Sequence, residues 1–167
     1  MSNITVRPKK FNFDGSPKYF YTDSKLINHF FNALSATFPP GEDFFVRSVR
    51  HFRRNDNSIL EKNISKFIGQ EAWHSMAHDT LNKYAEYHNI PLLKWDKRID
   101  KLLKQTEKLL TPEMCLAITA ALEHYTAAMG NELLTNDKWL NMFIEPYKEL
   151  LFWHATEEVE HQEVAYD

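Results

Sequence analysis

Two stretches of the chain place a carboxylate three residues before an imidazole. The first is Glu71-x-x-His74, and the second is Glu158-x-x-His161. If each stretch is helical, the two side chains of a pair lie one turn apart on the same face and can bind one metal ion together. A further histidine lies one turn from each pair on that face, and these histidines are His78 and His154.

A single glutamate in a predicted helix precedes each of these motifs. Glu42 comes before the first motif and Glu123 before the second. The order Glu, Glu-x-x-His, Glu, Glu-x-x-His is that of di-iron and di-manganese carboxylate bundles, in which four helices direct these side chains inward. Four carboxylates balance the charge of two divalent ions, and one imidazole binds each ion. We therefore predict a two-metal site with the ligands Glu42, Glu71, His74, Glu123, Glu158 and His161.

The spacing of the first two ligand-bearing helices brings their glutamates to the same level. One helix is predicted over 42–54, a turn over 55–58 and a long helix over 58–87. Glu42 lies 13 residues before the turn, and Glu71 lies 13 residues after the start of the second helix, which is roughly 20 Å of helix in each case. A hairpin of these helices therefore returns Glu71 to the level of Glu42.

The second half of the chain repeats this arrangement. Helices predicted over 112–134 and from 146 to the end of the chain are joined by a partly helical connection over 135–145. Glu123 lies 11 residues before the end of the first helix, and Glu158 lies 12 residues after the start of the second, roughly 17 Å in each case. These two glutamates therefore come level as well. Solvated helix faces and buried polar networks are the alternatives, but neither requires the matched order and lengths.

The whole pattern predicts an all-α, ferritin-like four-helix bundle with one or two extra helices, as a single domain over 1–167. Residues 1–22 are polar, aromatic and irregular, so we expect them to form an arm. A short helix is predicted over 24–37, stopped by the Pro-Pro-Gly segment at 39–41, and a charged helix over 92–110. Only four glycines are present, which argues against a β-sandwich or a barrel.

The composition is that of an ordinary soluble protein. Hydrophobic residues make up 43% and charged residues 26% of the 167 residues, with a net charge of −3. Apart from four arginines between 47 and 54 the basic residues are scattered, so no nucleic-acid partner is expected. No apolar run reaches the length of a membrane span, the first residues lack the apolar core of a signal peptide, and Cys115 is the only cysteine. We therefore expect a cytoplasmic protein, for which a homo-oligomer is possible.

Four segments that contain the candidate ligands resemble a known bacterial family. They are FPPGEDFF at 38–45, FIGQEAWH at 67–74 with His78, TAALEHYTA at 119–127, and WHATEEVEH at 153–161 followed by AYD at 165–167. This family is that of the predicted metal-dependent hydrolases, and the resemblance spans nearly the whole chain. It implies an enzyme in which metal ions activate water for hydrolysis. Family members usually continue further, so the resemblance also implies an additional C-terminal segment.

The ligand pattern also resembles that of the di-iron arylamine N-oxygenases. In those enzymes an extra histidine one turn before the last Glu-x-x-His binds iron, and His154 holds that position here. The resemblance implies that His154 is a seventh ligand, and the alternative is a histidine that supports a ligand or packs in the core. His78 is a further candidate with the same alternatives. We expect Glu157 and Glu160, on other faces of the last helix, to be solvated or paired with the arginines between 47 and 54.

Three functions are compatible with this site. The carboxylate-rich ligand set favours two iron ions, with Mn or Zn as alternatives, and hence an oxidoreductase that activates O2 and oxidises a small organic substrate. The family resemblance favours a metal-dependent hydrolase instead. The third function is that of a metal-binding or redox-sensing protein without an organic substrate. The sequence identifies no catalytic residue beyond the metal centre.

Overall fold

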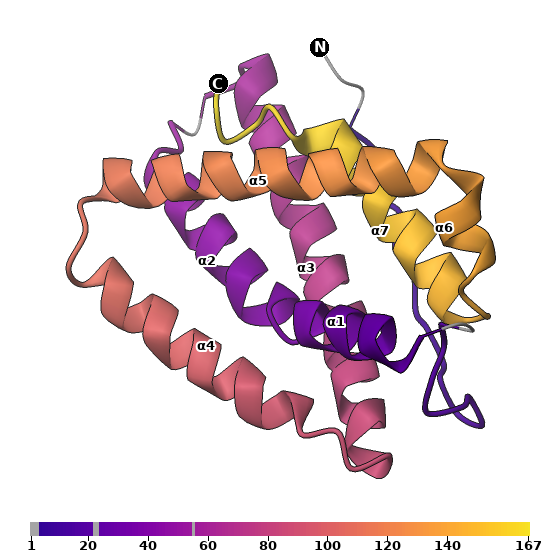
Figure 1. Cartoon of the computed structure of the whole chain (residues 1–167). Coiled ribbons are helices and arrows are strands. Elements are labelled where there is room, and N and C mark those ends of the chain that lie inside the picture. The colour runs from indigo at the N-terminus through magenta and orange to yellow at the C-terminus, as the bar shows by residue number, and fades with distance from the viewer. Residues whose placement is uncertain (1–3, 22–23, 55) are drawn as a thin grey trace.

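The computed structural model describes residues 4–21, 24–54 and 56–167 (Figure 1). Among these residues the only β-structure is an isolated bridge between Tyr21 and Phe143, so the predicted all-α fold class is confirmed. The helices are α1 (Lys25–Ser35), α2 (Phe38–His51), α3 (Ile59–Tyr87), α4 (Leu92–Glu107), α5 (Pro112–Thr135), α6 (Asp137–Asn141) and α7 (Tyr147–His161). No described helix has both the length and the apolar character that a membrane span requires.

The four helices that carry the candidate ligands pack as two pairs. α2 packs along α3 and α5 packs along α7, as the matched lengths predict. α2 also contacts α5, and α3 contacts α7, so the two pairs enclose a common interior. A Cβ at Gly130 of α5 would come 3.0 Å from the carbonyl oxygen of Ala155 in α7, so the glycine permits this close approach. In Figure 1, α5 extends across the upper part of the molecule, and α4 packs against α2 and α3.

Two apolar clusters flank the polar middle of α3. Phe67 belongs to one cluster, with Phe44 of α2, and Ala77 belongs to the other, with Trp153 of α7. The segment 70–74 lies between these two positions of the helix. Burial of one large apolar side chain stabilises the fold by about 1.5–3 kcal/mol. Packing on both sides therefore holds the carboxylate and imidazole of this segment inside the molecule.

The N-terminal arm has no helix over the described residues 4–21, yet it packs into the core. Its apolar side chains belong to the two clusters, and the buried ones are Ile4, Phe11, Phe13, Phe20 and Tyr21. Trp153 of α7 donates its indole N–H to the carbonyl of Arg7 at 3.1 Å. Aromatic burial and this hydrogen bond anchor the arm to α7. Residues 1–3 and 22 of the predicted arm lie outside the described residues.

The Pro-Pro-Gly segment belongs to α2 and does not merely separate two helices. α2 starts at Phe38, earlier than the predicted start at 42, so Pro39 and Pro40 occupy its first turn. The first N–H groups of a helix have no partner within the helix, which is why proline is tolerated there. The predicted extension of the last helix to the end of the chain is also wrong, because α7 ends at His161 and turns follow.

The starts of α3 and α5 agree with the sequence prediction. The side chain of Ser58 accepts a hydrogen bond from the backbone N–H of Glu61 at 3.2 Å, and Thr111 caps α5 in the same way. Pro112 follows Thr111 at the first position of α5. Asn55, predicted in the turn before α3, lies outside the described residues. These caps fix where each helix begins and hence the level of its glutamate.

Candidate metal centre

The six residues predicted as ligands come together in the interior of the molecule. Each is buried, with at most 5% of its surface exposed. They come from α2, α3, α5 and α7, and are Glu42, Glu71, His74, Glu123, Glu158 and His161. The two helix pairs therefore meet at this cluster, at the level that the matched lengths predict.

One side of the cluster is arranged around His161. Its Nε2 lies 3.0 Å from Oε1 of Glu71 and 3.0 Å from Oε2 of Glu123. Oε1 of Glu158 is 3.7 Å from the same nitrogen. Ligand atoms of Glu71, Glu123 and His161 all lie within 4.8 Å of one another, a spacing at which they could hold one metal ion.

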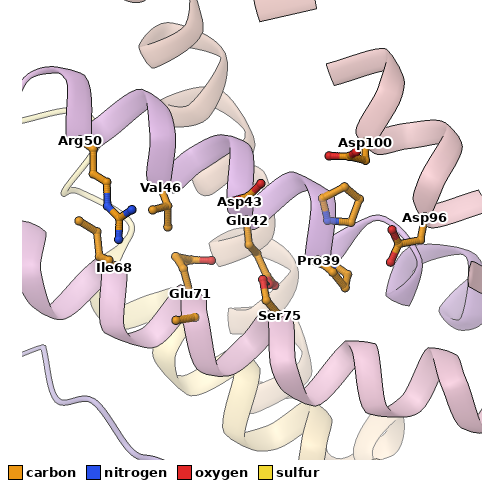
Figure 2. Close-up of a pocket in the computed structure, with 12 residues that line it drawn as sticks. Pro39, Glu42, Asp43, Val46, Arg50, Ile68, Glu71, Ser75, Asp96 and Asp100 are labelled. Carbon is orange, nitrogen blue, oxygen red and sulfur yellow. The ribbon is translucent and has the colours of Figure 1, made fainter. Parts of the chain in front are cut away.

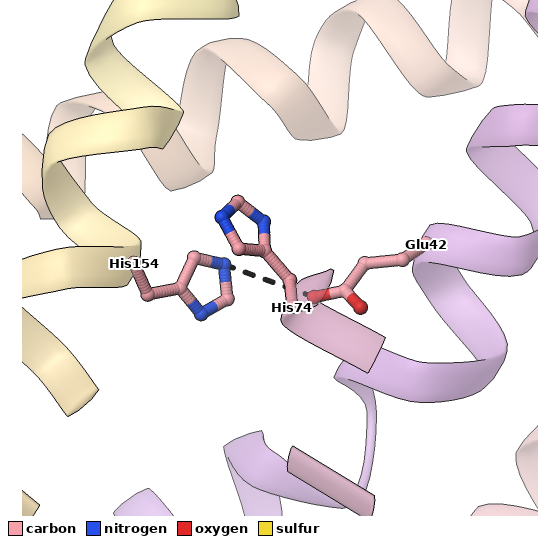
Figure 3. Close-up of side chains that lie close together, drawn as sticks. All are labelled: Glu42, His74 and His154. Carbon is pink, nitrogen blue, oxygen red and sulfur yellow. Dashed lines mark ion pairs between the residues drawn. The ribbon is translucent and has the colours of Figure 1, made fainter. Parts of the chain in front are cut away.

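The other side is arranged around His74. Its Nδ1 lies 3.5 Å from Oε1 of Glu158 and 3.8 Å from Oε2 of Glu71. His154 joins this side, because its Nε2 is 3.7 Å from Oε1 of Glu42 (Figure 3) and 2.9 Å from Oε1 of Glu158. Glu42, His74 and His154 form a second group within 4.8 Å, and Glu71, His74 and Glu158 form a third. Glu71 therefore faces both sides of the cluster.

Several ligand atoms of the cluster are buried without a hydrogen-bond partner. They are Oε1 of Glu42, both carboxylate oxygens of Glu71 and of Glu123, Nδ1 of His74 and Nε2 of His161. Some of these atoms are only 3.0 Å apart, but they are not aligned for a hydrogen bond. Buried polar atoms rarely remain unpaired, and unpaired ones destabilise the fold. Carboxylates and imidazoles that converge without bonding to one another fit divalent metal ions.

In the metal-free protein, protons reduce the negative charge of this cluster. Burial raises the pKa of Glu42 well above its usual value, and the charge of Glu71 adds to the effect. Burial also raises the pKa of Glu123, to about 8. For Glu71 burial also acts to raise the pKa, but the charge of His161 and the close approach of His161 and His74 together outweigh burial and lower the pKa. The cluster therefore combines protonated and ionised carboxyl groups at neutral pH.

Two imidazoles of the cluster are held in the charged form. Burial lowers the pKa of His74, but the hydrogen bond to Glu157 and the neighbouring carboxylates outweigh burial and raise it to about 10. Burial acts in the same way on His161, and the charges of Glu123 and Glu71 raise its pKa well above the usual value. At neutral pH Glu123 and His74 of the metal-free centre therefore carry protons, and the raised pKa values of Glu42 and His161 favour their protonated forms.

Binding of two divalent ions at neutral pH is expected to release protons, because the ions replace those held by residues such as Glu123 and His74. The apparent affinity is expected to rise with pH towards the pKa values of about 8 for Glu123 and about 10 for His74, since fewer protons then compete with the metal. Calorimetric titrations in buffers of different ionisation enthalpy, between about pH 6 and pH 8, measure both quantities. Metal binding without proton release would contradict this description of the centre.

His74 and His161 each use one ring nitrogen to contact a residue that the sequence pattern does not identify as part of the site. His74 Nε2 lies 3.1 Å from Oε2 of Glu157, which leaves Nδ1 on the side of the cluster. His161 donates from Nδ1 to the side-chain oxygen of Gln70 at 2.9 Å, so its Nε2 faces the carboxylates of the cluster. Partners of this kind fix the orientation and the tautomer of metal-binding histidines.

The prediction for Glu157 and Glu160 is wrong, because the N-terminal arm provides their partners. Glu157 is fully buried and accepts a hydrogen bond from the backbone N–H of Arg7 at 2.9 Å. Glu160 pairs with the guanidinium of Arg7 at 2.6 Å. Glu157 is not solvated, the side chain of Glu160 keeps 21% of its surface exposed, and neither pairs with the arginines between 47 and 54. The arm covers the face of α7 that the helical pattern assigns to solvent.

Replacing Glu157 by glutamine is expected to weaken metal binding by about 10- to 100-fold. The reason is that a neutral amide supports the imidazole of His74 less strongly than the carboxylate that now lies 3.1 Å from it. Calorimetric titration with Mn2+ or Zn2+ measures the change. Glu149→Gln is the matched control, since Glu149 lies in the exposed first turn of α7 and pairs with Lys9 of the arm at 2.8 Å. Equal affinities in the two variants would exclude this role for Glu157.

His78 lies behind His154 as seen from the cluster. Its Nε2 is 2.7 Å from Nδ1 of His154, and its Nδ1 is 2.9 Å from the hydroxyl of Ser35. Among the described residues, His78 takes part in none of the groups that could hold a metal ion, whereas His154 does. The structure therefore brings His154 to the predicted ligands and places His78 next to it as a supporting residue.

A backbone carbonyl sets the direction of the hydrogen bonds behind His154. Asn82 donates from its side-chain nitrogen to the carbonyl of Ser35 at 3.1 Å, so its oxygen accepts from the hydroxyl of Ser35 at 2.8 Å. The hydroxyl oxygen then accepts from Nδ1 of His78, and Nε2 of His78 accepts from Nδ1 of His154. This order directs the Nδ1 proton of His154 away from the cluster, so Nε2 faces the cluster, 2.9 Å from Oε1 of Glu158, and a metal ion would replace the proton of Nε2 there.

Two pockets of different character reach the cluster. One, of about 420 Å³, lies between α2, α3 and α4 and is lined in part by Glu42 and Glu71 (Figure 2). The other, of about 40 Å³, is mainly apolar, lies between α1, α5 and α7, and touches His154 and Glu158. It adjoins an apolar surface pocket of about 410 Å³, and the residues that line both are Phe31, Leu34, Met129 and Leu133.

Sequence comparison independently indicates metal dependence. A family model described as predicted metal-dependent hydrolase matches residues 5–167. No curated protein and no solved structure matches the chain. The matched range includes every residue of the buried cluster and most of the arm that supports it.

Proposed function

Because the chain belongs to the family of predicted metal-dependent hydrolases, we propose that it is a metal-dependent enzyme with two ions in the buried cluster. The proposed ligands are Glu42, His74 and His154 for one ion and Glu123 and His161 for the other, with Glu71 and Glu158 shared between them. This assignment uses the groups of converging atoms and gives each ion at least one carboxylate and one imidazole.

We further propose that the ions are iron and that the reaction is the oxidation of a small organic substrate by O2. The observation that carries this proposal is the composition of the cluster, in which four glutamates and three histidines from four helices are all buried. Carboxylate-rich sets of this kind inside helical bundles bind pairs of iron or manganese ions, whereas catalytic zinc sites use three protein ligands. When bound, a pair of iron ions supplies electrons for the reduction of O2.

The two adjoining apolar pockets, here called the apolar path, suit O2 and an apolar substrate. The pocket of about 40 Å³ beside His154 and Glu158 holds no more than a very small molecule. The adjoining pocket of about 410 Å³ has room for a small organic compound. Phe31 and Leu34 of α1 line both pockets, so the boundary between the pockets is apolar. A substrate in the outer pocket would therefore approach the cluster at His154 in apolar surroundings.

A metal-dependent hydrolase is the second candidate. It is favoured by the family description and by the pocket between α2, α3 and α4, here called the polar pocket. This pocket of about 420 Å³ reaches Glu42 and Glu71 from solvent. A pair of zinc or manganese ions there would lower the pKa of a bound water and polarise an ester, an amide or a phosphate. The residues of the cluster serve either reaction, so the identity of the metal and the role of O2 distinguish the two candidates.

The first experiment is metal analysis, with optical and Mössbauer spectra, of the chain produced with iron. Spectra are recorded before and after anaerobic reduction and after exposure to O2. Two iron ions per chain, a spectral change that requires O2 and consumption of O2 with an organic substrate would support the oxidoreductase. Zinc or manganese, no response to O2 and cleavage of p-nitrophenyl acetate without O2 would support the hydrolase, and redox cycling without turnover would support a redox sensor. A folded chain that binds no metal would overturn the proposal.

A further inference from the structure

We propose that divalent metal ions reach the centre through the polar pocket between α2, α3 and α4, and that Asp96 and Asp100 of α4 bind the incoming ion first. The ligand is a hydrated divalent cation. The inference rests on the proposed function in one respect only, which is that the cluster binds metal ions. It assigns a function to α4, a helix that contributes none of the proposed ligands of the centre.

The pocket connects solvent with unpaired carboxylate oxygens of the centre. Glu42 and Glu71 line it, although each is only 1% exposed. Oε1 of Glu42 and both oxygens of Glu71 have no hydrogen-bond partner. Figure 2 shows the two side chains extending from α2 and α3 into the space between these helices. Buried carboxylate oxygens of this kind are stabilised by a cation that arrives through the pocket.

The same pocket carries further acidic residues nearer its α4 side. Asp43 of α2 and both Asp96 and Asp100 line it, and Arg50 is the only basic residue among the described lining residues. Asp96 and Asp100 are four residues apart, so they lie one turn apart on the same face of α4 (Figure 2). A cleft with such an excess of one charge raises the local concentration and the association rate of ions of opposite charge by about 10- to 1000-fold.

The ion pairs of these aspartates leave them able to bind a divalent ion. Asp43 pairs with Arg47, and Asp100 pairs with Lys104 at 2.9 Å. The latter pair is on the surface, with the side chain of Lys104 56% exposed, and surface pairs of this kind are weak and easily replaced. Within the described part of the chain, Asp96 forms no ion pair with a basic side chain. A hydrated ion can therefore exchange some of its water for these carboxylates before it reaches Glu42.

The apolar path does not provide such ligands. Apart from His154 and Glu158 at its inner end, the narrow pocket is lined almost entirely by apolar residues. Glu132 is the one acidic residue among the described residues of the outer pocket. A hydrated ion would lose water there without gaining replacement ligands, which is strongly unfavourable. The two paths would therefore serve different molecules, with cations on the polar side.

The rate of metal loading tests this route. The metal-free chain is mixed with Co2+ in a stopped-flow instrument, and loading is followed by the visible absorption of the bound ion. The double variant Asp96→Asn, Asp100→Asn is expected to load at least about 10-fold more slowly than the wild type. It is expected to reach the same final stoichiometry, because neither aspartate is a ligand in the final site. Asp137→Asn is the matched control, since Asp137 is an exposed aspartate on α6 that does not line the pocket.

An unchanged loading rate in a double variant with the wild-type circular dichroism spectrum would overturn the route. A lower final stoichiometry would overturn it as well, since the aspartates would then belong to the final site. A second measurement needs no variant, because added salt is expected to slow loading of the wild type by screening the acidic pocket. A loading rate independent of salt would contradict the proposal. If the wild type bound no Co2+ at equilibrium, the proposed function itself would fail, and this inference with it.

Discussion

Replacing Glu71 by glutamine is expected to remove both metal ions from the chain, the largest effect of any single substitution in the centre. Glu71 belongs to two of the three groups of converging ligand atoms, and it faces His74 on one side and His161 on the other. An amide is uncharged and offers only its oxygen to a metal, so neither ion would keep its full set of ligands. Supporting residues contribute about 10- to 100-fold to metal affinity, and loss of a shared ligand is expected to exceed this.

A graded comparison makes this prediction specific. Glu123 belongs to a single group, so Glu123→Gln is expected to remove one ion and leave the other. Glu163→Gln is the control, since Glu163 is an exposed residue just beyond α7. Metal analysis after dialysis, together with Co2+ titration, counts the ions in each variant, and circular dichroism verifies the fold. Retention of two ions by the Glu71 variant would refute its shared role.

Removal of the metal ions is expected to lower the thermal stability of the chain strongly. A ligand that binds only the folded state stabilises it by about 4 kcal/mol when its free concentration is about 1,000 times its Kd. For a domain of this size each kcal/mol shifts Tm by about 2–4 °C, so one tightly bound ion is expected to raise Tm by about 8–16 °C. The physical source is the cluster itself, because the ion provides partners for buried oxygens such as those of Glu71 and Glu123.

Calorimetric melting curves with saturating metal and with a chelator measure this difference. The Glu71→Gln variant is the control, since it is expected to melt at the same temperature under both conditions. A wild-type chain whose Tm does not respond to the chelator would show that the metal contributes no stability. It would then be necessary to explain by other means how the chain keeps so many unpaired carboxylate oxygens inside its core.

The ligand-bearing helices could be predicted because their signals are local. The helical period alone puts Glu71 with His74, and Glu158 with His161, on one face of a helix. The level of each glutamate depends only on the rise per residue and on where the helix starts. The rise per residue is the same in every α-helix, and the start follows from a short segment such as the cap at Ser58. The structure has this cap. The sequence prediction places the start of α2 too late, because proline also marks the end of a helix, whereas Pro39 and Pro40 lie in the first turn of α2.

The residues that support the ligands could not be predicted in the same way. Glu157 is about 100° round the helix from Glu158, so the helical pattern places it on another face. It is buried because Arg7 and its neighbours in the arm cover that face on one side and His74 of α3 contacts it on the other. Gln70 is held by the arm as well, since its side-chain nitrogen donates to the carbonyl of Thr5 at 3.2 Å. No local pattern in α3 or α7 contains information about a segment without regular structure at the other end of the chain.

The sequence also could not choose between oxidation and hydrolysis. Glutamate and histidine bind iron, manganese and zinc, and a metal pair can activate either O2 or water. The family match supports metal dependence, and the structure adds the routes by which molecules can reach the candidate ligands. It shows that Glu42 and Glu71 are reached by a polar pocket, whereas His154 is reached by an apolar one. The identity of the bound metal and the requirement for O2 therefore decide between the two reactions.

The contact between Arg7 and Glu157 has a consequence for the synthesis of the protein. These residues are 150 positions apart, so the arm leaves the ribosome long before the helix on which it packs. Until α7 has emerged, the nascent chain lacks Glu158 and His161, and the aromatic residues of the arm have no complete surface to cover. The unfinished polypeptide therefore lacks part of the proposed ligand set, and the centre is expected to be completed only after translation has produced α7.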